Sequence, residues 1–103
     1  MAIAVIVENP HHGREQYAQV QAHVRGTGPV PPEGARLVLG GPAEQGWRMI
    51  SVWDSEEALE RFFAERLAPA YREAGMSLDD ITRTVFEVQT LTAGDLTGVP
   101  LPA

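Results

Sequence analysis

The order of apolar and polar residues along the chain predicts four strands. Residues 3–7 form an unbroken apolar run rich in β-branched side chains, which is typical of a strand covered on both faces. Further strands are expected over residues 35–39, 47–53 and 82–91, because glycine, proline or polar turn residues bound each of these stretches. Two longer intervals remain between the strands.

Both intervals have the apolar spacing of amphipathic helices. The first helix is expected from about Gly13 or Arg14 to Val24. Its apolar stripe comprises Tyr17, Val20 and Val24. The second helix is expected to end at Gly75. Its stripe comprises Leu59, Phe62, Phe63, Leu67, Ala70 and Tyr71.

The start and the middle of the second helix carry local signals. Either Asp54 or Ser55 can cap the first turn, and Glu57 stands three residues after Asp54, as in a capping box. Pro69 must bend or restart the helix, because its ring clashes with the preceding turn. One straight helix is therefore not expected here.

The resulting element order is β-α-β-β-α-β. It predicts an α+β fold of the ferredoxin-like type, in which two helices cover one face of a four-stranded antiparallel sheet. We expect a single domain over residues 1–91, since 103 residues amount to one domain. Residues 92–103 show no periodicity and are expected to form a C-terminal tail.

The charge and the residue content exclude several classes of function. The formal net charge is −6 and all eight basic residues are arginine, so no basic stripe is available for nucleic acid or an anionic membrane. The chain has no cysteine, which excludes disulfides and cysteine nucleophiles. The apolar start is too short for a membrane helix and no basic residue precedes it, which predicts a cytoplasmic protein. Abundant alanine, glycine and proline without lysine indicate a GC-rich bacterial coding sequence.

The first and third strands have apolar side chains on both faces. If the face opposite the helices met water, a contiguous apolar patch would be exposed, and such patches usually mark interfaces. The simplest partner is a second copy, packed sheet against sheet about a two-fold axis. We therefore predict a homodimer. The alternative is that the tail folds back over the open face.

Residues 46–55, with the sequence GWRMISVWDS, are followed by Ala-Leu at 58–59 and Phe-Phe at 62–63. This strand, with its aromatic-acidic end and the helix that follows, resembles the dimeric α/β-barrel superfamily and is most similar to the antibiotic-biosynthesis-monooxygenase-like branch. The resemblance covers about residues 2–91. It implies a ferredoxin-like subunit, a barrel formed by the two sheets of a dimer, and a small hydrophobic pocket in each subunit. Members include cofactor-independent oxygenases of aromatic polyketides, polyketide cyclases, haem-degrading enzymes and isomerases.

Two sites of this superfamily have no counterpart in the sequence. Haem-degrading members are expected to use a histidine on the second helix, and this chain has none between Asp54 and Gly75. The polyketide-cyclase pattern of a histidine within the first strand is also missing. Adjacent His11 and His12 do not share one helix face, so they form a weak metal pair. We therefore predict no metal and no bound organic cofactor.

The third predicted strand is a candidate binding wall. Trp47, Ser51 and Trp53 share one strand face, a pattern that suits stacking of a planar aromatic ligand beside one hydroxyl. The alternative is core packing, since tryptophan buries a large area. Tyr17 is a fourth candidate substrate-binding residue, with its hydroxyl at the pocket rim. The alternative is that its ring only packs in the core.

His12 and Glu87 are the candidate catalytic acid and base. His12 follows the first strand, where the alternative reading is a solvated turn. Glu87 shares a face of the last strand with Gln89, where the two can line a pocket or simply meet solvent at the end of the barrel. A buried carboxylate there would need Arg48 or Arg83 as a partner.

Two functions remain open. The first is a small-molecule-binding protein that acts as a cofactor-independent monooxygenase or cyclase on an aromatic or polyketide-like compound, by shape, desolvation and one or two proton-transfer groups. The second is a non-catalytic ligand-binding or dimerisation module, which the histidine-poor interior favours. The fold does not decide between them.

Overall fold

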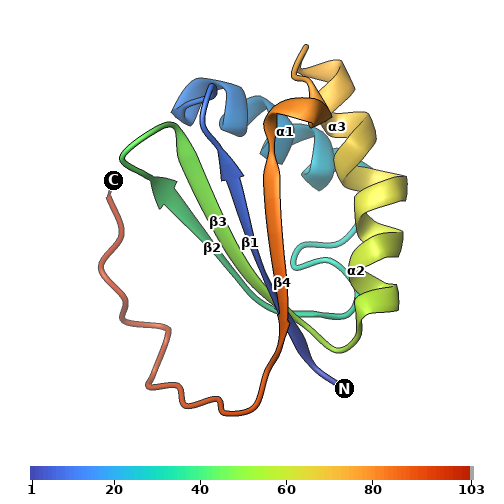
Figure 1. The fold of residues 1–103 in the computed structure, drawn as a ribbon. Helices are drawn as coiled ribbons and strands as arrows, with labels where there is room; N and C mark the ends of the chain where they lie inside the picture. The colour runs from blue at the N-terminus through green and yellow to red at the C-terminus, as the bar shows by residue number, and fades with distance from the viewer. Residues whose placement is uncertain (103) are drawn as a thin grey trace.

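Four antiparallel strands form one sheet. The computed structural model describes residues 1–102 and places the strands at Ile3–Asn9 (β1), Ala35–Pro42 (β2), Trp47–Trp53 (β3) and Thr82–Glu87 (β4). Their order is β2-β3-β1-β4, so β1 and β4 lie side by side although they are far apart in sequence (Figure 1). The predicted α+β, ferredoxin-like fold is confirmed.

The helices cover one face of this sheet (Figure 1). Helix α1 spans Arg14–Thr27, and the second helical element consists of α2 (Glu56–Phe62), a π-helical turn η1 (Phe63–Leu67) and α3 (Ala68–Glu73). A 3-10 turn, η2 (Leu78–Asp80), leads into β4. Among residues 1–102, no helix combines the length and the apolar character that a membrane crossing requires.

The cap of α2 is Ser55. Its hydroxyl oxygen accepts a hydrogen bond from the Ala58 amide at 3.1 Å. Asp54 instead forms an ion pair of 2.6 Å with Arg36, so the capping box expected from Asp54 and Glu57 is wrong. The carboxylate of Asp54 is drawn to the start of β2, away from the helix end.

The second helical element restarts at Pro69, as the sequence predicts. Pro69 is in the first turn of α3, immediately after the widened turn η1. Proline is tolerated in a first turn because its missing N–H would have no helical partner there. Gly75 follows α3 with a φ of 73°, a left-handed conformation that ends the helix.

Several element ends differ from the prediction. Strand β4 ends at Glu87, because its last ladder bond runs from the Val88 amide to the carbonyl of Ala2 at 2.9 Å, at the start of the chain. Strands β1 and β2 are two and three residues longer than expected, since both keep pairing with β3 up to Trp47. Helix α1 also continues three residues past Val24.

The two faces of the sheet are set by the strand register. Val5 of β1 lies opposite Ser51 of β3 and Val85 of β4, and directly opposed residues share a face. On the helix-side face Met49, Ser51 and Trp53 are buried, as the alternation along this strand predicts.

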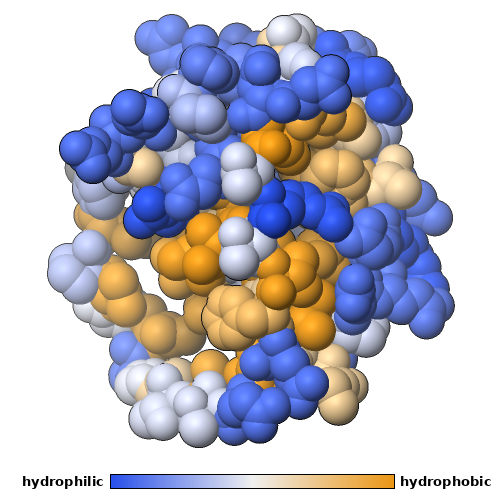
Figure 2. All heavy atoms as spheres, viewed as in Figure 1, coloured by the Kyte–Doolittle hydropathy of each residue, from blue (hydrophilic) through white to orange (hydrophobic). Residues whose placement is uncertain are grey.

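The opposite face of the sheet is open. It carries the apolar side chains of Ala4, Ile6, Leu39, Ile50, Val52 and Phe86. Leu39 is 48% exposed and Phe86 is 51% exposed. Figure 2 shows an apolar patch in the middle of the view, rimmed by hydrophilic side chains. This patch is the surface that the sequence assigns to a second copy.

The C-terminal tail does not cover this face. It leaves β4 as an extended arc (Figure 1), and open space separates part of it from the body of the protein (Figure 2). Residues 89–102 are all exposed. The alternative in which the tail folds back over the sheet is therefore not the arrangement observed.

Candidate functional site

A cavity of about 390 Å³ lies between the sheet and the helices. Its walls come from all four strands, from α1, from the second helical element and from the loop before β2. The apolar lining comprises Val5, Val7, Tyr17, Val20, Val24, Val30, Pro31, Pro32, Leu37, Val38, Met49, Trp53, Leu59, Phe62, Phe63, Leu67 and Tyr71. The polar lining comprises Gln21, Arg25, Arg36, Ser51 and Arg83. An apolar pocket with few polar groups is the usual form of a small-molecule site.

Trp53 and Ser51 form the sheet-side wall. The indole N–H of Trp53 donates a 2.8 Å hydrogen bond to the Ser51 hydroxyl oxygen. Trp53 is only 2% exposed, and its ring packs against Phe62 with the ring centres 5.2 Å apart. The serine therefore satisfies the one polar atom of a buried indole, and its own hydroxyl hydrogen stays available to an acceptor in the cavity.

Two tyrosines line the helix-side wall. Tyr71 donates a 2.8 Å hydrogen bond to Oδ1 of Asn9. Burial raises the pKa of Tyr71 to about 12. Burial raises the pKa of Tyr17 further, with a smaller contribution from Tyr71. Both hydroxyls are therefore neutral at physiological pH.

The π-helical turn shapes the wall next to these tyrosines. Phe62, Phe63 and Leu67 are half-buried, and each borders the cavity. Arg66, in the same turn, lies over the Phe62 ring at 5.5 Å and donates a 2.6 Å hydrogen bond to the Val24 carbonyl. This contact ties η1 to the end of α1. Such π-helical turns are frequent at functional sites.

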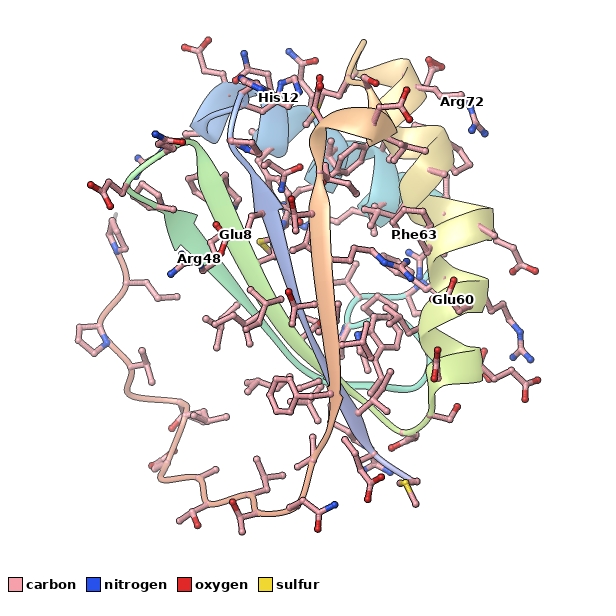
Figure 3. All side chains as sticks on the ribbon, in the orientation of Figure 1. Glu8, His12, Arg48, Glu60, Phe63 and Arg72 are labelled. Carbon is pink, nitrogen blue, oxygen red and sulfur yellow. The ribbon has the colours of Figure 1, made fainter. Side chains whose placement is uncertain are left out.

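The charged residues that line the cavity are arginines. Arg36 pairs with Asp54, and Arg83 pairs with Glu60 at 2.5 Å while it covers the Phe63 ring at 4.6 Å. Figure 3 shows Glu60 and Phe63 together on the helical side of the molecule. Among residues 1–102, no aspartate, glutamate or histidine lines the cavity.

The structure brings together three of the four predicted substrate-binding residues. Tyr17, Ser51 and Trp53 line the cavity, and Trp47 does not. The Trp47 ring instead stacks on the ring of Tyr17, with centres 5.6 Å apart and planes 19° apart. Its N–H points to the Met49 sulfur at 3.2 Å. Trp47 therefore packs against Tyr17 instead of bordering the cavity, which was its predicted position.

The two predicted catalytic residues lie away from the cavity lining. His12 is half-buried in the turn after β1, at the end of the sheet (Figure 3). Glu87 is exposed at the end of β4 and accepts a 2.6 Å hydrogen bond from Gln89. Neither expected arginine partner is used, since Arg48 pairs with Glu8 and Arg83 pairs with Glu60. A catalytic role for either residue stays a prediction.

Sequence reasoning overlooked Asn9, Arg25 and Arg36. Asn9 precedes a proline and has the signature of a turn former, which concealed that it is fully buried. Arg25 is at the polar end of α1, and Arg36 is the extra residue at the irregularity between Ala35 and Leu37 in β2. Bulges often re-aim side chains near functional sites, but this one is visible only in the strand register. The sequence therefore carries no signal for Arg36.

Neither a protein-family model nor a curated protein sequence matches this chain. Solved structures match it in fold. SnoaB, a cofactor-independent oxygenase from Streptomyces nogalater, is 15% identical with a TM-score of 0.61, over 87% of this chain and 94% of SnoaB. The monooxygenase ActVA-Orf6 from Streptomyces coelicolor, solved with the ligand Nanaomycin D, is 16% identical with a TM-score of 0.56, over 91% and 92%. A dimeric ferredoxin-like protein of unknown function from Jannaschia sp. CCS1 is 17% identical with a TM-score of 0.57, over 85% and 100%.

These matches agree with the resemblance seen in the sequence. The structural neighbours include a cofactor-independent oxygenase, a monooxygenase and a dimeric ferredoxin-like protein. At this level of sequence identity, the matches establish the fold alone. Evidence for an activity must come from the chemistry of the cavity.

Proposed function

We propose that this protein binds a planar aromatic or polyketide-like compound in the cavity and supports its oxygenation or cyclisation without a bound cofactor. The observation that carries the proposal is the cavity, whose volume of about 390 Å³ and aromatic walls suit a small fused-ring molecule. The same fold in a cofactor-independent oxygenase, SnoaB, supports it.

In an oxygenation without a cofactor, the substrate is the only source of electrons for the reduction of O₂. A methylene group between aromatic rings loses both C–H bonds and gains a C=O bond, while the second atom of O₂ leaves as water. The substrate supplies all four electrons. The first step is loss of a proton from that methylene, which leaves a carbanion whose charge spreads onto a ring oxygen.

The residues that line the cavity can stabilise the negative charge of this carbanion, but they are poorly suited to remove the proton from the methylene group. Tyr17 and Tyr71 are neutral phenols with raised pKa values, so they are poor bases. The hydroxyl hydrogen of Ser51 and the guanidinium groups at the cavity can donate hydrogen bonds to a developing oxyanion. The protein then supplies shape and hydrogen-bond donors, and the substrate must be acidic enough to ionise.

The test uses anthrone, an aromatic ketone with such a methylene group. Anthrone should quench tryptophan fluorescence, and the protein should accelerate oxygen uptake above the rate in buffer. Trp53→Phe should change the quench more than Trp47→Phe, since only Trp53 lines the cavity. Melting temperatures of both variants control for lost packing. No quench and no thermal shift with a panel of fused-ring compounds would rule out the binding site.

The alternative function is a non-catalytic ligand-binding module. The absence of a carboxylate or imidazole from the cavity lining, among the residues described, favours it. Saturable binding of anthrone without faster oxygen uptake would support this alternative. Parallel assays of His12→Gln and Glu87→Gln test whether either residue takes part in proton transfer.

We also propose that the protein is a homodimer formed through the open sheet face. The exposed Leu39 and Phe86 lie on that face, and a contiguous apolar patch usually marks an interface. The Jannaschia protein of the same fold is dimeric, which supports the proposal. Two sheets packed in this way would form the predicted α/β barrel.

A further inference from the structure

The charge of the cavity lining is opposite to the charge of the chain. Acidic residues outnumber basic residues by 14 to 8, yet the charged side chains of the lining are all arginines. These are Arg25 on α1, Arg36 on β2 and Arg83 on β4. A cavity that collects only cationic groups on an acidic protein favours a ligand that carries negative charge.

The three guanidinium groups differ in what they already bind. The carboxylate of Asp54 occupies Arg36, and the carboxylate of Glu60 occupies Arg83. Arg25 has no ion-pair partner or side-chain hydrogen bond within residues 1–102, and it is exposed. Its planar fork of donors is therefore free to receive a ligand.

Arg25 is not needed to complete the end of its own helix. An arginine in a last turn commonly bonds the final carbonyls and complements the helix dipole. In α1 the Val24 carbonyl already accepts hydrogen bonds from Arg66 at 2.6 Å and from the Thr27 hydroxyl at 3.2 Å. One terminal carbonyl of α1 is thus satisfied by other side chains, one of which is the cationic Arg66.

We propose that Arg25 binds a carboxylate on the ligand, and that the cavity takes aromatic acids in preference to neutral aromatic compounds. The ring system lies between the sheet and the helices, and the carboxylate meets the guanidinium fork at the exposed edge of the cavity. Arginine and carboxylate match in geometry, because two parallel N–H groups face two oxygens. This inference rests on the proposed binding site and does not depend on an oxygenase reaction.

The experiment compares two ligands with one ring system. Anthracene-9-carboxylic acid and 9-anthracenemethanol are titrated into the full-length protein, with tryptophan fluorescence and calorimetry as readouts. The acid should bind about threefold to fivefold more tightly, the range for an ion pair with an exposed arginine. Arg25→Gln should abolish this preference, and Arg25→Lys should keep part of it. Arg14→Gln, at an exposed arginine on the same helix outside the cavity lining, is the matched control.

The possible outcomes separate this inference from the proposed function. Equal affinity for the two compounds, or an acid preference that survives in Arg25→Gln, overturns the role of Arg25 while the binding site stands. An equal loss of preference in Arg14→Gln also overturns it, since a general field effect then explains the result. If neither compound binds the wild-type protein, the proposed function fails as well. Thermal unfolding of each variant shows that it is folded.

Discussion

The Tyr71 hydroxyl donates a 2.8 Å hydrogen bond to Oδ1 of Asn9, and this bond joins α3 to the end of β1 inside the protein. Both residues have an exposed fraction of 0%. The amide nitrogen of Asn9 has no hydrogen-bond partner among the described residues, so the bond to Tyr71 is the one side-chain interaction that satisfies this asparagine. Because Tyr71 lines the cavity, the pair also holds part of the cavity wall in place.

Removal of the Tyr71 hydroxyl should destabilise the protein. In Tyr71→Phe the buried Oδ1 of Asn9 loses its donor, and an unsatisfied buried polar atom costs about 1–3 kcal/mol. Urea unfolding of Tyr71→Phe, Asn9→Ala and the double variant measures the coupling. We expect a coupling energy of at least about 0.5 kcal/mol, as for residues in contact. Simple additivity of the two single changes would contradict the bond.

The stability should fall at alkaline pH through the two tyrosines. The pKa of Tyr71 rises from its ordinary 10.0 to about 12 on folding, so the neutral phenol is favoured in the folded state. The resulting stabilisation is fully present below pH 10 and is lost as the pH rises from 10 through about 12. The chain has no lysine or cysteine, so tyrosines are its only side chains that ordinarily ionise in this window.

Tyrosinate absorbance, recorded together with circular dichroism, tests this pH dependence. The two signals should change in one cooperative transition above pH 10, and Tyr71→Phe should show a shallower loss of stability in that range. A gradual tyrosine titration centred near the ordinary pKa of 10.0, in a protein that stays folded, would be the contrary result.

The cap of α2 gives a matched pair of variants. Ser55→Ala removes the oxygen that accepts the Ala58 amide and should cost about 1 kcal/mol of unfolding free energy. Asp54→Ala removes only an ion pair of exposed side chains, which is worth at most about 1 kcal/mol and often nothing. The melting temperature of Ser55→Ala should therefore be lower than that of Asp54→Ala. The reverse order would move the cap to Asp54.

The turn between β2 and β3 requires glycine at position 46. Gly46 has a φ of 74°, and an added methyl group would meet the Asn9 carbonyl oxygen at 1.9 Å. Gly46→Ala should cost at least about 1 kcal/mol from the backbone conformation alone, and the clash adds to that. Gly26→Ala is the control, since it lies in α1 with nothing within 4 Å, and it should gain up to about 1 kcal/mol. Similar stabilities of the two variants would contradict this account.

The dimer interface can be tested on the open sheet face. Phe86→Glu, at a side chain that is 51% exposed in the single chain, should place a charge in the interface and yield monomers. Val30→Glu changes a residue that is 55% exposed in the loop before β2 and should leave the oligomeric state unchanged. Light scattering should report twice the chain mass of 11.2 kDa for the wild type. A monomeric wild type at micromolar concentration would refute the interface.

The spacing of apolar residues determined the helices and strands and the side of each that is buried. Val20, Val24 and Tyr17 recur on one side of a helix, and the strand from Trp47 to Trp53 alternates, so each set shares a face whatever the rest of the chain does. The fold class followed, because two apolar helices and four strands have few ways to bury these faces together. Local geometry carries this information, and a single sequence is enough to read it.

Tertiary structure alone decided where the cavity opens and which side chains reach it. Trp47 and Trp53 share a strand face, yet the ring of Tyr17 covers one and the cavity borders the other. Asn9 and Tyr71 are 62 residues apart and meet only because α3 packs across the end of β1. Arg25, Arg36 and Arg83 come from three elements, and no spacing rule relates them. The position and the volume of a cavity depend on how the side chains of several elements pack together, so they are defined only in the complete fold.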